Sequence, residues 1–184
     1  MKLFISLGLC CFLGFSASFA QEAKSYSELV KKVNKSLESN ASPDTVLKYT
    51  SKLISMNNKE ASIYTIIGSA FQMKDQDENA ILAFNRALSF NSGDINTLYN
   101  ISVSYVRLSE EAYKKMELIS KQKDANSETK SQKIKELMAV NLRGYCMAKY
   151  YLEKAHKQNQ GIASVNTLHY KVKEALGNHN CFSN

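Results

Sequence analysis

The sequence has 184 residues, one proline, seven glycines and a formal net charge of +7. This length suits one domain with its own core, and the scarcity of proline and glycine argues against strands and long linkers. The positive charges are spread among carboxylates and form no block, which predicts solvated helix surfaces and argues against a nucleic-acid-binding protein. The composition therefore favours an all-α protein.

The first twenty residues have the pattern of a secretory signal peptide. Lys2 precedes an apolar run over residues 3–15 that is too short for a membrane span, and residues 18–20 have the small residues of a cleavage site. We expect cleavage after residue 20 and export as a periplasmic or secreted protein. A lipid anchor on Cys10 or Cys11 is the competing interpretation, although neither cysteine follows the small residue that such an anchor requires.

Residues 27–60 are predicted to form a first pair of helices. Ser25 and Glu28 have the spacing of a capping box and would open the first helix. Ser42 as N-cap, with Pro43 at the first helical position, would open the second. The apolar spacing of this pair is irregular, as expected at the end of a stack.

Residues 61–94 have the most regular pattern. Counting Ala61 as position 1, small or apolar residues stand at positions 4, 7, 8, 11, 20, 24 and 27, which are Tyr64, Ile67, Gly68, Phe71, Ala80, Phe84 and Ala87. Glycine lowers helix propensity by about 1 kcal/mol relative to alanine, so we expect a second helix to approach closely at Gly68. The polar turn that follows predicts Asp75 as the N-cap of the second helix, with Glu78 in the capping-box position.

Residues 95–158 are predicted to form a third pair with lengthened helices. The first helix continues the same spacing, but the pattern of small residues in its partner comes at Ala148, Leu152 and Ala155, 34 residues later than in a regular pair. We therefore expect both helices to extend as a hairpin arm over about residues 112–142.

The chain is expected to close with a helix over residues 162–176 and a tail over 178–184, with Gly177 as C-cap. Cys146 and Cys181 remain after signal cleavage. In an oxidising compartment such a pair can form one disulfide that ties the tail to the long helix. Equally, Cys146 can be a small buried apolar residue, and both interpretations stay open.

The spacing in residues 61–94 is that of a tetratricopeptide repeat, a helix–turn–helix unit of 34 residues. The chain resembles exported bacterial tetratricopeptide-repeat proteins in which a late repeat carries a long helical hairpin, including the tyrosine-rich stretch at residues 150–155. The resemblance covers most of residues 27–177. It implies a short α-solenoid of helix pairs within residues 21–177, with an extended two-helix arm and a C-terminal capping helix.

In that family, the first helix of each pair lines a concave groove that binds a segment of a partner protein. Carried over to this chain, the resemblance implies a groove formed by Thr65, Ser69, Gln72, Met73, Asn96, Tyr99, Asn100, Val103 and Arg107. Asn100 and Arg107 resemble part of a clamp that some members use for a peptide carboxylate. Thr65 and Ser69 occupy the positions of other clamp groups, which disfavours a complete clamp.

No known catalytic or metal-binding motif occurs in the sequence. It has no glycine-rich phosphate loop and no HExxH, GxSxG or CxxC. His156, His169 and His179 are scattered, and the carboxylates at residues 75–78 lack the glycine and distal glutamate of a calcium loop. We therefore predict that the protein is not an enzyme and uses no cofactor or metal.

The leading hypothesis is a non-enzymatic, exported interaction module that binds a protein or peptide through the groove. The alternative is a structural or assembly subunit of an envelope complex that acts through the arm, where self-association is possible. An exposed apolar stripe along the arm, beyond what the hairpin buries itself, would favour the second hypothesis.

Overall fold

The structure, a computed structural model, describes residues 21, 24–36, 38, 39, 41–56, 60–122 and 127–181. All regular secondary structure in this part of the chain is α-helical. The chain divides into two compact units, residues 1–59 and 60–184. The predicted signal peptide, residues 123–126 of the predicted arm and residues 182–184 of the predicted tail lie outside the described residues.

The first unit contains a helical segment over residues 24–36 and helix α2, Pro43–Ser55. The Ser42 side chain accepts a hydrogen bond from the Thr45 N–H, which confirms Ser42 as the N-cap of α2. The predicted capping box is wrong, because the earlier helix already includes Lys24 and Ser25 is therefore not its N-cap. The apolar residues that this unit buries are Val33, Val46 and Leu53.

The second unit begins with helices α3, Ala61–Gln72, and α4, Asp77–Phe90. They meet at Gly68, where a Cβ atom would overlap the ring of Phe84, with ring atom Cζ only 2.7 Å away. Phe84 is fully buried, and the small residues predicted beside it, Ala80 and Ala87, are buried as well. The predicted close approach of two helices at Gly68 is confirmed. Ile67 is buried at this contact, whereas Tyr64 and Phe71 are only partly buried.

Asp75 ends α3 instead of starting α4. Its φ of 54° is left-handed, its N–H donates to the Gln72 carbonyl, and the next N–H, of Gln76, donates to the Phe71 carbonyl. These are the two hydrogen bonds of a Schellman motif, which closes a helix C-terminus. The predicted N-cap at Asp75 is wrong, because Gln76 precedes α4 and makes no capping hydrogen bond through its side chain.

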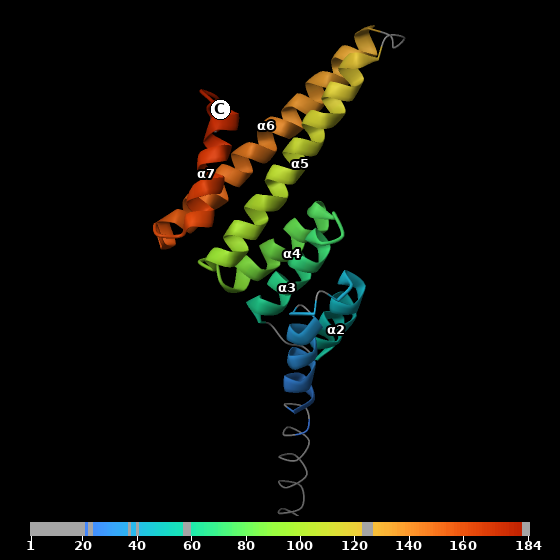
Figure 1. Cartoon of the computed structure of the whole chain (residues 1–184), viewed down its shortest axis with the longest axis vertical. Helices are drawn as coiled ribbons and strands as arrows, with labels where there is room; N and C mark the ends of the chain where they lie inside the picture. The colour runs from blue at the N-terminus through green and yellow to red at the C-terminus, as the bar shows by residue number, and fades with distance from the viewer. Residues whose placement is uncertain are drawn as a thin grey trace, which may run out of the picture. The chain divides into compact units, whose positions relative to one another are not determined.

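Helices α5, Ile95–Lys121, and α6, Ser127–Gln158, pack against each other along their length and form the predicted arm (Figure 1). A Cβ on Gly144 of α6 would overlap the Ser109 hydroxyl of α5. Nearer the tip, the Asn141 amide donates to the Ser109 carbonyl at 2.8 Å, and the Lys130 ammonium donates to the Ser120 carbonyl at 2.7 Å. Close packing and side-chain hydrogen bonds to main-chain carbonyls therefore hold the two helices of the arm together.

Helix α7, Ala163–Leu176, packs against α6 and closes the second unit (Figure 1). It ends at Gly177, which has a φ of 52°. A disulfide joins Cys146 of α6 to Cys181 beyond α7, with the two Cα atoms 5.2 Å apart. One continuous core runs from α4 to α7 and includes Phe84, Leu98, Ile101, Leu152, Val165 and Val172.

None of the helices in the described part of the chain combines the length and the hydropathy needed to cross a bilayer. The architecture is the predicted one: all-α helix pairs, a two-helix arm and a closing helix.

Replacing Gly68 with alanine should destabilise the protein, although alanine is the better helix former. Overlap with the buried Phe84 ring should cost about 1–3 kcal/mol, which on balance outweighs the gain in helix propensity of about 1 kcal/mol. Thermal and urea unfolding followed by circular dichroism would measure the change. G93A is the matched control, since a Cβ on Gly93 meets its nearest atom at 3.6 Å. A G68A protein as stable as G93A would contradict the proposed contact, and F84L should partly rescue G68A.

The disulfide should contribute strongly to stability, because it closes a loop with a sequence separation of 35 residues. The loop-closure entropy of such a crosslink corresponds to a contribution of about 4 kcal/mol. Reduction of the mature protein should therefore lower its unfolding midpoint. The C146S/C181S variant should begin at the lower midpoint and should not respond to the reductant. If the wild-type protein unfolds identically with and without reductant, the disulfide does not stabilise it.

Candidate functional site

The nine residues predicted to form the groove lie on α3 and α5 or directly after α3. These two helices are joined by a hydrogen bond of 2.6 Å between the hydroxyls of Thr65 and Thr97. Thr97 itself donates to a carboxylate oxygen of Asp94, also at 2.6 Å, and the Thr65 hydroxyl also lies 3.2 Å from the Ala61 carbonyl of its own helix. Thr65 is thus bound within the protein and does not face a ligand as a free hydroxyl.

Gln72 makes the second link between the two helices. Its side-chain amide donates to the Asn100 carbonyl and to the Ser104 hydroxyl, both at 2.8 Å. Ser69 donates to the Thr65 carbonyl of its own helix at 3.0 Å. The side-chain donors of Gln72 and Ser69 are therefore satisfied within the protein.

Arg107 makes the third link, from α5 to the turn between α3 and α4. Its Nη1 donates to the Gln72 carbonyl at 3.1 Å, its Nη2 pairs with Asp75, and its Nε lies 3.3 Å from Asp77 Oδ2. All three guanidinium nitrogens are engaged. Arg107 is consequently not poised as a free cation for the carboxylate of a peptide, as the resemblance to a clamp implied.

Asp77 is the buried member of this cluster, with a side chain that is 7% exposed. Burial raises the pKa of its carboxyl above the ordinary value of 3.8, while the hydrogen bond from Ser104 and the charge of Arg107 act in the opposite direction. Its Oδ1 is buried and finds no hydrogen-bond partner among the described residues. Arg107 therefore compensates a carboxylate that burial destabilises.

The remaining predicted residues make no side-chain hydrogen bond to the neighbouring helix, and the Tyr99 ring packs against the core. Met73 is 50% exposed and Asn96 is exposed, whereas Tyr99, Asn100 and Val103 are partly buried. We call these five residues the α3/α5 face. It combines a flexible thioether, a phenol ring and two amides on a support held by the three links.

The sequence analysis missed the links themselves. Thr65 and Thr97, Gln72 and Ser104, and Asp75 and Arg107 are each separated by 32 residues. This constant separation of 32 residues, close to the length of one repeat, is a pattern that could have been recognised in the sequence. It marks polar residues that meet across neighbouring repeats.

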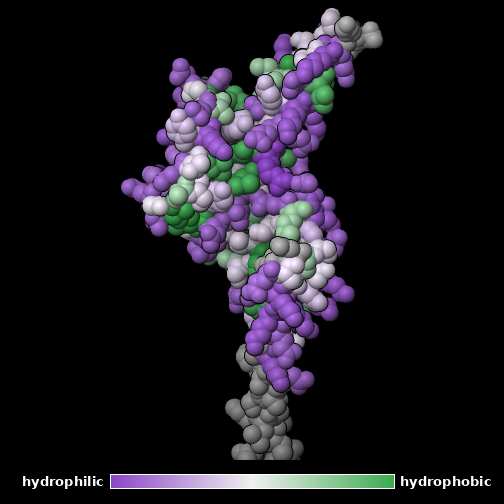
Figure 2. Space-filling model, viewed as in Figure 1, coloured by the Kyte–Doolittle hydropathy of each residue, from purple (hydrophilic) through white to green (hydrophobic). Residues whose placement is uncertain are grey.

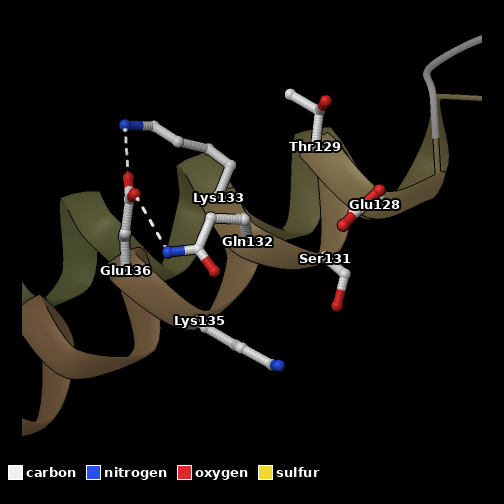
Figure 3. A pocket seen from close by; sticks show the side chains of 7 residues that line it. All are labelled: Glu128, Thr129, Ser131, Gln132, Lys133, Lys135 and Glu136. Atoms are coloured by element: carbon white, nitrogen blue, oxygen red, sulfur yellow. Dashed lines mark hydrogen bonds and ion pairs between the residues drawn. The ribbon is translucent and has the colours of Figure 1, made fainter.

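Described residues of the second unit also line two surface hollows. The first hollow is lined by successive turns of α6 between Glu128 and Glu136. The side chains that line it point in different directions (Figure 3). Within it, Glu136 accepts hydrogen bonds from Lys133 at 3.0 Å and from Gln132 at 3.5 Å. The second hollow surrounds Arg107 and Asp77 and also includes Glu110 and Lys114.

The scattered histidines and cysteines do not converge on a metal site in the described residues. Cys146 and Cys181 are joined as a disulfide and cannot act as thiolate ligands. His169 is packed between α6 and α7, where burial lowers its pKa, and its ring centroid lies 6.1 Å from that of His156.

No protein-family model and no curated protein matches the sequence. Among solved structures, the OM64 TPR domain of Arabidopsis has a TM-score of 0.59 and 10% identity over 83% of this chain and 98% of that domain. The fold is that of a tetratricopeptide-repeat (TPR) domain. Two MamA structures each have a TM-score of 0.46. One is 17% identical and covers 90% of this chain and 82% of its own length. The other is 18% identical and covers 87% of this chain and 83% of its own length. In the TPR fold of this chain, α3 with α4 and α5 with α6 are helix pairs.

Replacing Arg107 with alanine should destabilise the protein by about 1–2 kcal/mol, a value reduced because Arg107 is partly exposed. Without Arg107 the pKa of Asp77 should rise further. A carboxyl with a higher pKa in the folded than in the unfolded state binds its proton more tightly when folded, so stability increases as the pH falls through that pKa. The loss of stability in R107A should therefore become smaller as the pH falls from neutral toward the raised pKa of Asp77.

Urea unfolding at several pH values would measure the loss of stability in R107A. K114A, seven residues further along α5, is the control. When D77N is combined with R107A, the loss of stability and its pH dependence should both disappear, because residue 77 then carries no buried charge that Arg107 would have to compensate. An R107A deficit that is constant with pH would show that Asp77 is not the group responsible.

Proposed function

We propose that the protein is a non-enzymatic interaction module that binds a segment of a partner protein across the α3/α5 face. The observation that carries this proposal is the set of three links between successive repeats. They hold α3 and α5 in one register, so a partner would meet a face that is already ordered. Preorganised surfaces lose less conformational entropy on binding.

The groups of the α3/α5 face suit a peptide segment. Tyr99 offers a large, partly buried ring, the kind of residue that dominates the energy of protein interfaces. Met73 can adapt to differently shaped apolar side chains. The amides of Asn96 and Asn100 each offer a donor and an acceptor, which can satisfy the backbone of a bound segment. A binding role for the Arg107 charge is not part of the proposal.

The test is affinity isolation from the source cell with the wild-type protein and with Y99A/M73A. Removal of an anchor ring should weaken capture of a specific partner about tenfold or more. L82A is the matched control, because Leu82 is 68% exposed but lies on α4. Circular dichroism should show equal helicity in all three proteins. A partner captured equally by Y99A/M73A and wild type would place binding elsewhere.

We also propose that the chain is exported through its N-terminal segment and works in the periplasm or outside the cell. Cys146 and Cys181 support this, since disulfides persist in oxidising compartments. Expression of the full chain, followed by fractionation and intact mass measurement, should find an exported protein that begins at residue 21. A cytoplasmic protein that retains residues 1–20 would contradict export.

A second candidate function is assembly through the arm. Along α5 and α6, Tyr113, Leu118, Met138 and Leu142 are 37–65% exposed, and hydrophobic atoms interrupt the polar surface of the arm in Figure 2. Under this alternative the protein should self-associate, and L118S/M138S/L142S should reduce its mass in light scattering. A wild-type protein that stays monomeric at high concentration would contradict self-association.

A further inference from the structure

A second surface, on α6, is distinct from the α3/α5 face. Six residues of this helix follow one another at spacings of three and four, which places them on one side of the helix. We call them the α6 stripe: Val140, Arg143, Met147, Tyr150, Lys154 and Lys157. The stripe extends over 17 residue steps, or about 26 Å of helix.

Of the apolar residues of the stripe, Met147 alone is partly buried and packs against the core. The residues that α6 buries are Gly144, Cys146, Ala148, Tyr151, Leu152 and Ala155, and none of them belongs to the stripe. Val140 is 49% exposed and Tyr150 is 41% exposed, while Arg143 and Lys157 are exposed as well. Apolar surface is thus left open between charged residues.

The charge of the stripe has one sign. It carries Arg143, Lys154 and Lys157, and no carboxylate in the described residues forms an ion pair with any of them. Glu153 lies on the α7 side of α6, within 4.0 Å of Lys149 and His169. The stripe therefore presents uncompensated positive charge beside exposed apolar groups.

Two aromatic contacts order the middle of the stripe. The Lys154 ammonium lies 5.6 Å from the centroid of the Tyr150 ring, within the range of a cation–π interaction. The Tyr150 ring in turn packs edge-on against Tyr151, with centroids 5.1 Å apart. Tyr151 is buried and donates its hydroxyl to Asn85 of α4 at 2.9 Å. The exposed ring is thus supported from beneath.

We propose that the α6 stripe binds an acidic amphipathic helix of a protein partner. The apolar residues of the stripe, Val140, Met147 and Tyr150, stand seven and three residues apart, and this spacing suits the anchors that a helix presents on one face. Cations along the stripe would pair with carboxylates beside those anchors, which gives orientation and a faster encounter. The stripe lies on one side of one helix and is about 26 Å long, which matches a single partner helix laid along it.

The test uses a fluorescent 18-residue probe peptide that has leucines at spacings of three and four, glutamates on both sides of them and no basic residue. A scrambled peptide of equal composition is its control. The mature protein should bind the probe more tightly than the scrambled peptide in fluorescence anisotropy. R143E/K154E/K157E should weaken binding at least about tenfold, since three close charge pairs become repulsive.

K114E/K135E/K171E is the matched control, because it changes the net charge equally at exposed lysines outside the stripe. It should weaken binding less than about threefold by comparison, through long-range charge alone. Equal losses in the two triple variants, or a wild-type protein that does not distinguish the two peptides, would overturn the proposal. Y99A/M73A should bind the probe normally, which separates this surface from the α3/α5 face.

Nuclear magnetic resonance of the wild-type protein provides a test that needs no variant. The probe should shift the amide signals of residues 140–157 most strongly, and shifts confined to other helices would overturn the proposal. Vesicles of phosphatidylglycerol serve as the competing target. If R143E/K154E/K157E loses vesicle binding but binds the probe unchanged, the stripe is a membrane-binding surface and the proposed helical partner is wrong.

Discussion

The contact between Gly68 and Phe84 is the constraint on which the second unit depends. Because Gly68 has no side chain, α3 can approach α4 until the Phe84 ring fills the space that a Cβ would occupy. Phe84 then belongs to the core that continues through Leu98 of α5 and on to α7. Gly144 repeats the arrangement in the next pair, where Ser109 occupies the corresponding space.

Polar contacts, in contrast, determine how one pair lies against the next. The hydrogen bonds of Thr65 and Gln72 and the ion pairs of Arg107 all join residues that are nearly one repeat apart. Hydrogen bonds are directional, so they fix a register that apolar contact alone would leave variable. The same bonds withdraw Gln72 and Arg107 from ligand binding, and the part of the face that remains is Met73, Tyr99 and their neighbours.

Helix α6 has three sides with different roles. Its small buried residues, such as Gly144 and Ala148, let it lie close to α5. Cys146 and Glu153 mark the side that meets α7. The remaining side carries the α6 stripe, and of its apolar residues Met147 alone is partly buried and packs against the core. Rigid scaffolds that present uncommitted groups are suited to binding.

The sequence by itself determined the helix pairs, the arm and the closing helix, because apolar periodicity and small residues at fixed spacing follow directly from helix geometry. It also identified Gly68 as a contact point and Ser42 as an N-cap. It failed at Asp75, since a carboxylate between two helices can cap either of them, and only the left-handed backbone there shows that it ends α3. Only the tertiary structure decided which residues of the predicted groove are free. The partners of Gln72 and Arg107 lie on other elements, and a pattern within one helix contains no information about the distance between two.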